Sequence, residues 1–147
     1  MSPREIKRKR IGDILIEAGQ INEDDLQRAL EKQGQSGKKI GEILIDLEYV
    51  TAEEIIQFLA LQFRIPFIKI ENYEISSDMV NLIPKSLALK YVCIPLDKMG
   101  DAISFVVSDP TNLYDLKQQE SFLNCTMNFF LTTPQSLEEA IKKYYGV

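Results

Sequence analysis

The stretch RIGDILIEAG at residues 10–19 returns as KIGEILIDLE at residues 39–48, so that Arg10 in the first copy corresponds to Lys39 in the second. Both copies continue in the same way, through apolar positions with matched spacing to a final glutamine, Gln33 in one copy and Gln62 in the other. Repetition at a fixed period of this length indicates two copies of one supersecondary unit. The rest of the chain is therefore interpreted around this pair.

The spacing within each copy predicts two short helices joined by a turn. Apolar residues at i, i+3, i+4 and i+7 share one face of a helix, and each copy has such a set: Ile11, Ile14, Leu15 and Ala18, then Ile40, Ile43, Leu44 and Leu47. Gly19 is expected to end the first helix and Asn22 to cap the second, which Gly34 would end. In the second copy Thr51 and Glu54 form the pattern of a capping box. With residues 34–38 as the connector, the pattern predicts a four-helix unit.

The pattern changes near Arg64 from helical periodicity to short apolar runs, which predicts a second subdomain. We expect a strand at 67–70, two short helices within 77–89, a hairpin from strands at 91–96 and 102–107, a helix at about 112–123, a strand at 127–131 and a helix after Thr133 and Pro134. The fold class is therefore α+β: a flexible basic arm at 1–9, a tandem helical-hairpin ligand-binding subdomain at 10–63, and a small α/β sandwich-like subdomain at 64–147.

Composition limits the class of protein. With 45% hydrophobic and 27% charged residues the chain is an ordinary globular sequence, and its net charge of −5 argues against a nucleic-acid binder. No apolar run reaches the ~20 residues of a membrane span and no signal sequence is recognisable, so no membrane insertion and a cytoplasmic location are expected. Both repeats open on a cluster of cations. This pattern fits either a solvated basic arm or a local anion site.

The sequence offers little for catalysis. Histidine, the usual general base and the commonest metal ligand, is absent. The glycines at Gly34 and Gly37, before Lys38, are too close together for a phosphate loop, and no hydroxyl residue follows the lysine. We therefore expect no enzyme activity, no catalytic residue, no metal site and no cofactor.

The repeats instead suggest a ligand with two similar halves. Each copy places a cation before an apolar residue and a glycine, and ends on a glutamine, so two copies side by side would present these groups with approximate twofold symmetry. A matching ligand would be twofold, anionic and partly apolar. Cyclic dinucleotides have two phosphates, and in cyclic di-GMP two guanine edges can accept a bidentate contact from arginine.

Residues 10–62 resemble the MshEN domain, the N-terminal cyclic di-GMP-binding module of bacterial type II secretion and type IV pilus assembly ATPases, whose signature is a tandem R-L-G-x-x-L-x-x-x-G-x(6)-L-x-x-x-L-x-x-Q. Residues 64–147 resemble the second N-terminal subdomain of the same ATPases, notably at IPF 65–67, LIP 82–84, SDP 108–110 and AIKKYYG 140–146. The resemblance implies a regulatory cyclic di-GMP-binding module, with secretion or pilus machinery proteins as partners. The alternative is a docking module for a platform component that binds no nucleotide.

The resemblance also implies which residues bind the ligand. They are Arg10, Ile11, Gly12, Leu15, Gly19, Leu26, Leu30 and Gln33 in the first copy, and Lys39, Ile40, Gly41, Leu44, Ile55, Leu59 and Gln62 in the second. Two positions depart from the signature. Lys39 replaces an arginine and lacks its planar fork, which should weaken affinity. Glu48 replaces a glycine, so that either the turn is strained by roughly 1–2 kcal/mol or its geometry changes. We assign Ile14, Ala29, Ile43 and Phe58 to the core.

Overall fold

The computed structural model describes residues 11–110 and 113–147. Its contacts divide the chain into two compact units, the first ending at Phe58 and the second beginning at Leu59. From residue 11 onward, four helices begin in the first unit: α2 (Ile11–Glu17), α3 (Glu23–Ser36), α4 (Ile40–Asp46) and α5 (Ala52–Phe63). The sequence pattern placed the boundary at 63/64, whereas the units divide inside α5. The final residues of α5 are tied to the second unit: Ile65 donates its N–H to the carbonyl of Ala60, and the carbonyl of Pro66 accepts the N–H of Leu131.

The two repeats fold into the same local structure. Gly19 ends α2 with φ of 76°, and Glu48 follows α4 with φ of 62°. The hydrogen bonds around these residues also match: Gln20 N–H donates to Leu15 C=O at 3.0 Å, and Tyr49 N–H donates to Leu44 C=O at 3.1 Å. The turn at Glu48 thus keeps the geometry of a glycine turn and is strained, which answers the alternative left open by the sequence.

Capping residues begin the second helix of each repeat as expected. Asn22 and Asp25 form a reciprocal capping box at the start of α3, with N···O distances of 2.8 and 3.1 Å. Thr51 and Glu54 form the corresponding box at the start of α5, at 3.1 and 3.2 Å. Each box satisfies two backbone N–H groups that the first helical turn leaves without partners.

Two details of the repeats differ from expectation. Gly34 does not end α3, which continues to Ser36 and closes at Gly37, where φ is 73°. A glycine inside a helix costs about 1 kcal/mol relative to alanine. The helix continues past Gly34 because Gly37 supplies the left-handed residue that ends it. Ala18 does not join the buried face of α2. The helix ends at Glu17, so Ala18 lies in the exposed turn.

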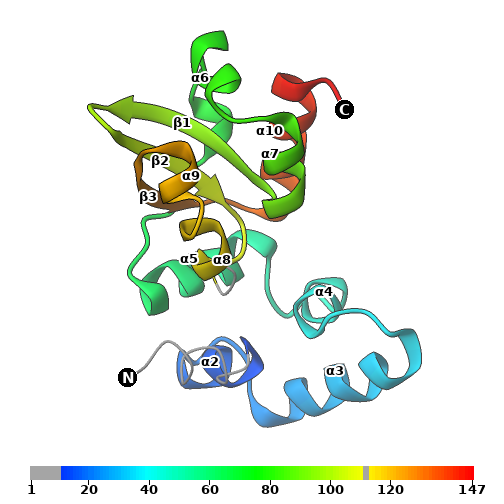
Figure 1. Cartoon of the computed structure of the whole chain (residues 1–147). Coiled ribbons are helices and arrows are strands. Elements are labelled where there is room, and N and C mark those ends of the chain that lie inside the picture. The colour runs from blue at the N-terminus through cyan, green and yellow to red at the C-terminus, as the bar shows by residue number, and fades with distance from the viewer. Residues whose placement is uncertain (1–10, 111–112) are drawn as a thin grey trace. The chain divides into compact units, whose positions relative to one another are not determined.

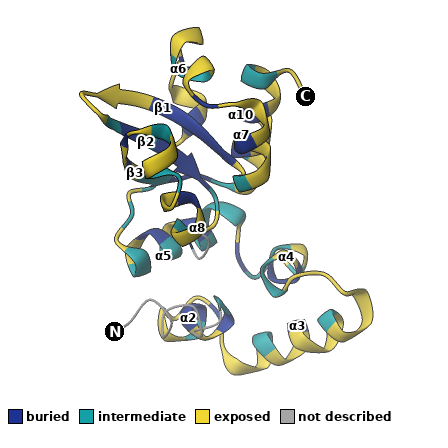
Figure 2. Cartoon of the chain, in the orientation of Figure 1, coloured by how far each residue is buried: buried dark blue, intermediate teal, exposed yellow. Residues whose placement is uncertain are grey.

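The apolar faces of the helices meet in the core of the first unit. The core contains Leu15, Ile21, Ala29, Ile43, Leu44 and Val50. Ile14, Ala29 and Ile43 are buried, which confirms their assignment to the core, and Phe58 is half-buried against it. Figure 2 shows that α3 is exposed along most of its length, with buried positions concentrated on α2 and α4.

The second unit is built on a three-stranded sheet in the order β1, β2, β3. Strands β1 (Cys93–Met99) and β2 (Ala102–Val107) form an antiparallel hairpin, and β3 (Thr126–Leu131) lies parallel to β2. Helices α6 (Ser77–Leu82), α7 (Lys85–Tyr91) and α10 (Pro134–Tyr145) accompany the sheet, and α8 (Leu113–Lys117) and α9 (Glu120–Leu123) form the crossover from β2 to β3 (Figure 1). Apolar residues of α10, including Leu137 and Ile141, pack with Ile94 and Val106 of the sheet. The α+β class is confirmed.

The prediction of a strand at 67–70 is wrong. Phe67 makes one isolated bridge with Leu131, and the chain then turns into a short 3₁₀ helix, η1 (Ile70–Asn72). Tyr73 N–H donates to the carbonyl of Ile70, so the backbone leaves the edge of the sheet before a ladder can form.

The hairpin is tighter than the sequence suggested. Tyr91 belongs to α7, β1 extends to Met99, and only Gly100 and Asp101 remain in the turn, because Gly100 adopts φ of 63°. Two-residue hairpin turns need such positive φ values.

The single helix expected at about 112–123 is two short helices, and Asn112 lies outside the described residues. The break at Gln118 and Gln119 has a tertiary cause. Gln119 Nε2 donates to the hydroxyl of Tyr91 at 3.2 Å, and Glu120 Oε2 accepts the N–H of Met127 at 2.7 Å.

Candidate functional site

The candidate ligand-binding residues lie along matched segments of the two repeats. Arg10 falls outside the described residues. From the first copy, α2 carries Ile11, Gly12 and Leu15, the following turn contains Gly19, and α3 carries Leu26, Leu30 and Gln33. From the second copy, Lys39 directly precedes α4, which carries Ile40, Gly41 and Leu44, and Ile55 lies on α5. Leu59 and Gln62 lie further along α5, within the second unit, so the site is built here from the residues before them.

A glycine faces an aliphatic side chain in both repeats. A Cβ added to Gly12 would lie 2.6 Å from Leu26 Cδ1, and one added to Gly41 would lie 3.9 Å from Ile55 Cδ1. The first distance is shorter than real Cβ contacts, whereas the second is an ordinary van der Waals contact. The same pair of positions therefore packs in both copies, tightly in the first and loosely in the second.

Two of the expected ligand contacts are core residues. Leu15 and Leu44 occupy matched positions, and each has 0% of its surface exposed. Their side chains are enclosed by the hydrophobic core of the first unit.

The stripe on α3 is more open. Leu26 and Gln33 are half-buried, and Leu30 between them is 36% exposed. These residues recur at i, i+4 and i+7 and so share one side of the helix. An apolar surface with an amide at one end is thus accessible on this helix.

The two lysines before α4 differ in their contacts. Lys38 Nζ lies 3.0 Å from Asp46 Oδ2, and this hydrogen bond raises the pKa of Lys38. Lys39 precedes the first residue of α4, is exposed, and makes no side-chain capping hydrogen bond. Lys38 is therefore occupied with a carboxylate, while Lys39 extends into solvent with its charge available to an anion.

Sequence reasoning missed one contact that joins the repeats. Arg28 of α3 donates from Nη1 to the hydroxyl of Tyr49, in the turn before α5, at 3.4 Å. Asp25 lies 3.9 Å from the same nitrogen. The pKa of Arg28 is raised by the Tyr49 hydrogen bond first and by the nearby carboxylates second. No sequence signal exposes this contact, because Gln20 and Gln57 stand at the matched positions.

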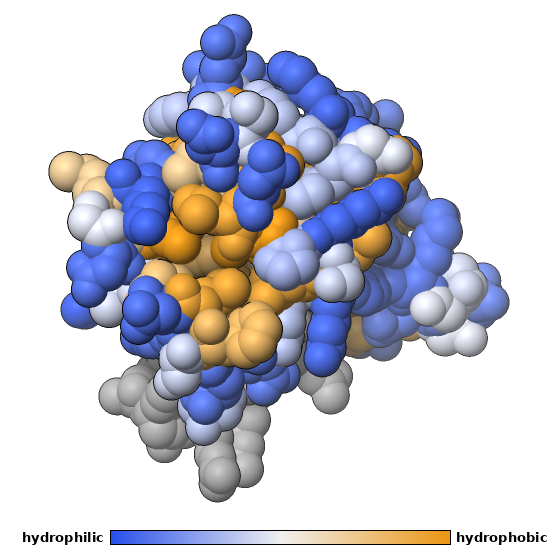
Figure 3. Space-filling view, turned by 45° about the horizontal axis from the view of Figure 1, so that its top comes forward, coloured by the Kyte–Doolittle hydropathy of each residue, from blue (hydrophilic) through white to orange (hydrophobic). Residues whose placement is uncertain are grey.

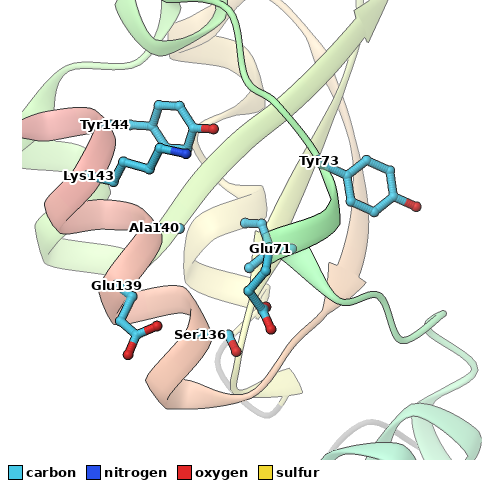
Figure 4. A pocket seen from close by; sticks show the side chains of 8 residues that line it. Glu71, Tyr73, Ser136, Glu139, Ala140, Lys143 and Tyr144 are labelled. Atoms are coloured by element: carbon cyan, nitrogen blue, oxygen red, sulfur yellow. The ribbon is translucent and has the colours of Figure 1, made fainter.

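The second unit has a pocket that the sequence did not suggest. It has a volume of about 180 Å³ and lies between η1 and α10 (Figure 4). Glu71 and Glu139 stand on opposite walls, Ser136 lies near one end, and Lys143 and Tyr144 lie near the other. Lys143 Nζ lies 5.1 Å from the centre of the Tyr144 ring, within cation–π range. The pocket carries both signs of charge and holds none of the candidate ligand-binding residues.

Both cysteines, Cys93 and Cys125, are free and buried. Burial raises the pKa of Cys93 to about 12, so its thiol is protonated at neutral pH and is a poor nucleophile. In the described parts of the chain, no helix is both long and apolar enough to cross a membrane.

Comparison with known families and structures gives consistent results. The family model of the MshEN domain matches residues 63–147, which begin after the two repeats. The chain is 25% identical over 137 residues to the type IV pilus assembly ATPase PilB of Myxococcus xanthus, and 28% identical over 147 residues to PilB of Thermus thermophilus. These alignments cover 93% and 99% of this chain but only 24% and 16% of the relatives. The chain thus spans a quarter or less of their length.

Among solved structures, the chain is similar to MshE with cdg. The two superimpose with a TM-score of 0.79 at 29% identity, covering 94% of this chain and 100% of the other. The similarity therefore includes the repeats as well as the second unit.

Proposed function

The chain belongs to the MshEN domain family, and on this basis we propose that it binds cyclic di-GMP through its tandem repeats and acts as a regulatory module of a bacterial type II secretion or type IV pilus system. One observation carries the proposal: two copies of the same left-handed turn, capping box and glycine-to-aliphatic contact occur in a chain that is similar over 94% of its length to MshE with cdg, the abbreviation of cyclic di-GMP.

The local chemistry suits such a ligand. Gly41 has no side chain and is loosely packed at the start of α4, so that a ligand can approach the backbone there, whereas Leu26 fills the corresponding space beside Gly12. The open stripe on α3 offers Leu30 for stacking against a purine and Gln33 for hydrogen bonds to its edge. Lys39 supplies a cation in the second copy. Arg10 would supply the first, and an arginine can contact a guanine edge or a phosphate through two parallel N–H groups.

The similarity to PilB suggests where the module acts. We place it in the cytoplasm as part of a pilus or secretion ATPase system, with proteins of that machinery as partners. The chain itself would bind nucleotide without hydrolysing it, because its 34–39 segment lacks the spacing of a phosphate loop. Binding of cyclic di-GMP would then be the signal that the module passes on.

A thermal-shift titration with cyclic di-GMP tests the proposal. A ligand at one hundred times its Kd stabilises the native state by about 2.7 kcal/mol, which for a protein of this size corresponds to a rise in Tm of roughly 5–10 °C. GMP at the same concentration is the control, because one molecule carries one base and cannot span both copies. A Tm that cyclic di-GMP does not raise, with no heat of binding by calorimetry, would refute the proposal.

The alternative function, docking of a partner protein without nucleotide, is favoured by one feature of the second unit. Several of its large apolar side chains are exposed, with Met99 at 79% and Phe122 at 77%, and Figure 3 shows apolar surface gathered in the middle of one face among charged side chains. Exposed apolar patches mark interaction surfaces in many soluble proteins. Association with a pilus or secretion platform protein that is lost in Phe122→Ser and is unaffected by cyclic di-GMP would support this alternative.

A further inference from the structure

We propose that the pocket between η1 and α10 binds an arginine side chain of a partner protein, with an acidic residue next to that arginine. The pocket belongs to the second unit and holds none of the candidate ligand-binding residues, so this function is separate from nucleotide binding. The size of the pocket and the distribution of charge along it point to this occupant.

The pocket has room for one side chain. Its volume is about 180 Å³, whereas sites for drug-sized ligands enclose roughly 300–1,000 Å³. Its charged residues Glu71, Glu139 and Lys143 are exposed, while Ile70 and Ala140 of the lining are buried. An apolar floor between charged walls suits a long amphipathic side chain, because the carbon stem packs on the floor while the charged head reaches the walls.

Charge is separated along the pocket. Figure 4 shows Glu71 and Glu139 reaching from opposite walls toward the end where Ser136 lies, while Lys143 and Tyr144 lie at the other end. In the described parts of the chain, Glu71 forms no ion pair. The N-terminus of α10, near Ser136, adds only about half a positive charge against two carboxylates. The Ser136 end therefore attracts a cation, and the Lys143 end attracts an anion.

The carboxylate of Glu139 is not neutralised by a lysine of its own helix. Glu138 pairs with Lys142, four residues later, at 3.3 Å. Glu139 and Lys143 have the same spacing, but Lys143 Nζ lies over the ring of the next residue, 5.1 Å from its centre. Glu139 instead accepts a hydrogen bond from the neutral amide of Gln135 at 3.3 Å. Its negative charge is thus left for a ligand in the pocket to neutralise.

Arginine is the cation that matches this end. Among the described residues, no three His, Cys, Asp or Glu side chains are placed to hold a metal ion, so the pair of carboxylates is not a metal site. A lysine ammonium is a compact point charge, whereas the planar guanidinium has five N–H donors and can contact two carboxylates at once. Arginine is also enriched among the side chains that anchor protein–protein interfaces.

The arginine belongs to a protein rather than being the free amino acid. Ion pairs at exposed carboxylates are weak, so a lone arginine would bind with a Kd on the order of millimolar. Within a larger interface the same contacts fix the register of the partner and add to the contacts around them. Lys143 makes the pocket selective, because it attracts an acidic neighbour of the arginine and repels a second basic residue.

The test uses blocked tetrapeptides as stand-ins for the partner and follows the backbone amide signals of the full chain by NMR. The peptides are Gly-Arg-Asp-Gly, Gly-Lys-Asp-Gly and Gly-Arg-Arg-Gly. We expect the Arg-Asp peptide to shift the amides of Glu71, Ala140 and Lys143 to saturation, with a Kd of about 1–10 mM. The Lys-Asp and Arg-Arg peptides should each bind about threefold more weakly or worse.

Two neighbouring glutamates provide matched variants. Glu139→Gln removes a carboxylate of the pocket and should raise the Kd of the Arg-Asp peptide by about threefold to fivefold. Glu138→Gln makes the same change on the same helix, at a carboxylate that is paired with Lys142, and should change this Kd by less than about twofold. Lys143→Gln should abolish the preference for the Arg-Asp over the Arg-Arg peptide.

Non-specific attraction of cationic peptides to a chain of net charge −5 predicts the opposite ranking, with the Arg-Arg peptide the tightest. That ranking, equal losses in Glu138→Gln and Glu139→Gln, or pocket amides that no peptide shifts to saturation would overturn the proposal. Equal binding of the Lys-Asp and Arg-Asp peptides would overturn the assignment of arginine. Because no nucleotide is present in these titrations, none of these results decides whether the repeats bind cyclic di-GMP.

Discussion

Replacing Glu48 by glycine should stabilise the first unit. Glu48 has φ of 62° and is exposed, so it bears the cost of the left-handed conformation without a buried contact in return. That cost is about 1–2 kcal/mol for a residue with a Cβ. Glycine removes it but gives the unfolded chain more freedom, which offsets about 0.4–1 kcal/mol. The expected net gain is about 0.5–1 kcal/mol in the free energy of unfolding.

Urea denaturation followed by circular dichroism measures this gain. With an m-value of about 2 kcal/mol/M, the midpoint should rise by about 0.25–0.5 M. Amide hydrogen exchange in α4 and α5 then shows whether the gain belongs to the first unit. Glu48→Gln is the matched control, because it removes the charge and keeps the strained backbone, and it should not share the gain.

The reciprocal substitution strengthens the test. Gly19 has φ of 76° in the matched turn of the first repeat, so Gly19→Ala should lower the stability by about 1 kcal/mol. If Glu48→Gly proves no more stable than the natural chain, or if Glu48→Gln gains as much, backbone strain at this turn is not the cause. The charge of Glu48 would then be the better explanation.

Three further predictions concern the same repeats. Gly41→Ala should stabilise by about 0.5–1 kcal/mol through helix propensity, whereas Gly12→Ala should not, because its Cβ would lie 2.6 Å from a leucine methyl; urea midpoints compare the two variants. Arg10→Ala should weaken cyclic di-GMP binding more than Lys39→Ala, since a bidentate contact is worth about 1–3 kcal/mol, and equal losses by calorimetry would show that both act as point charges. The purified chain should not hydrolyse ATP, and turnover abolished by substituting Lys38 would contradict this.

The sequence by itself determined the parts of this protein that depend on neighbouring residues. The repeat can be read directly from the amino-acid sequence. The capping boxes at Asn22 and Thr51 follow from side chains that reach a backbone N–H three residues away. The sequence also marked Glu48 as a turn that is either strained or altered, because the matched residue in the first copy is a glycine, and the φ of 62° decided for strain. The positions of α6, α7 and α10 followed from proline and from helical periodicity.

Other features depended on contacts between residues distant in sequence. The helix expected at about 112–123 is broken where Gln119 donates to the hydroxyl of Tyr91, a residue 28 positions earlier that the local pattern cannot place beside it. The run at 67–70 has strand-like composition but leaves the sheet after one bridge to Leu131. Local periodicity indicates which face of a helix or strand is apolar. It does not indicate which distant groups will form hydrogen bonds with that segment and interrupt it.

The candidate site divides in the same way. Sequence spacing identified Gly12, Gly41 and Lys39 as matched and chemically distinctive positions. Only the tertiary structure decided that Leu15 is enclosed in the core, and that Gly12 packs tightly where Gly41 packs loosely. The structure also decided that Asp46 forms an ion pair with Lys38, while Lys39 is exposed to solvent. An ion pair forms only between groups that the fold brings within a few ångströms of each other.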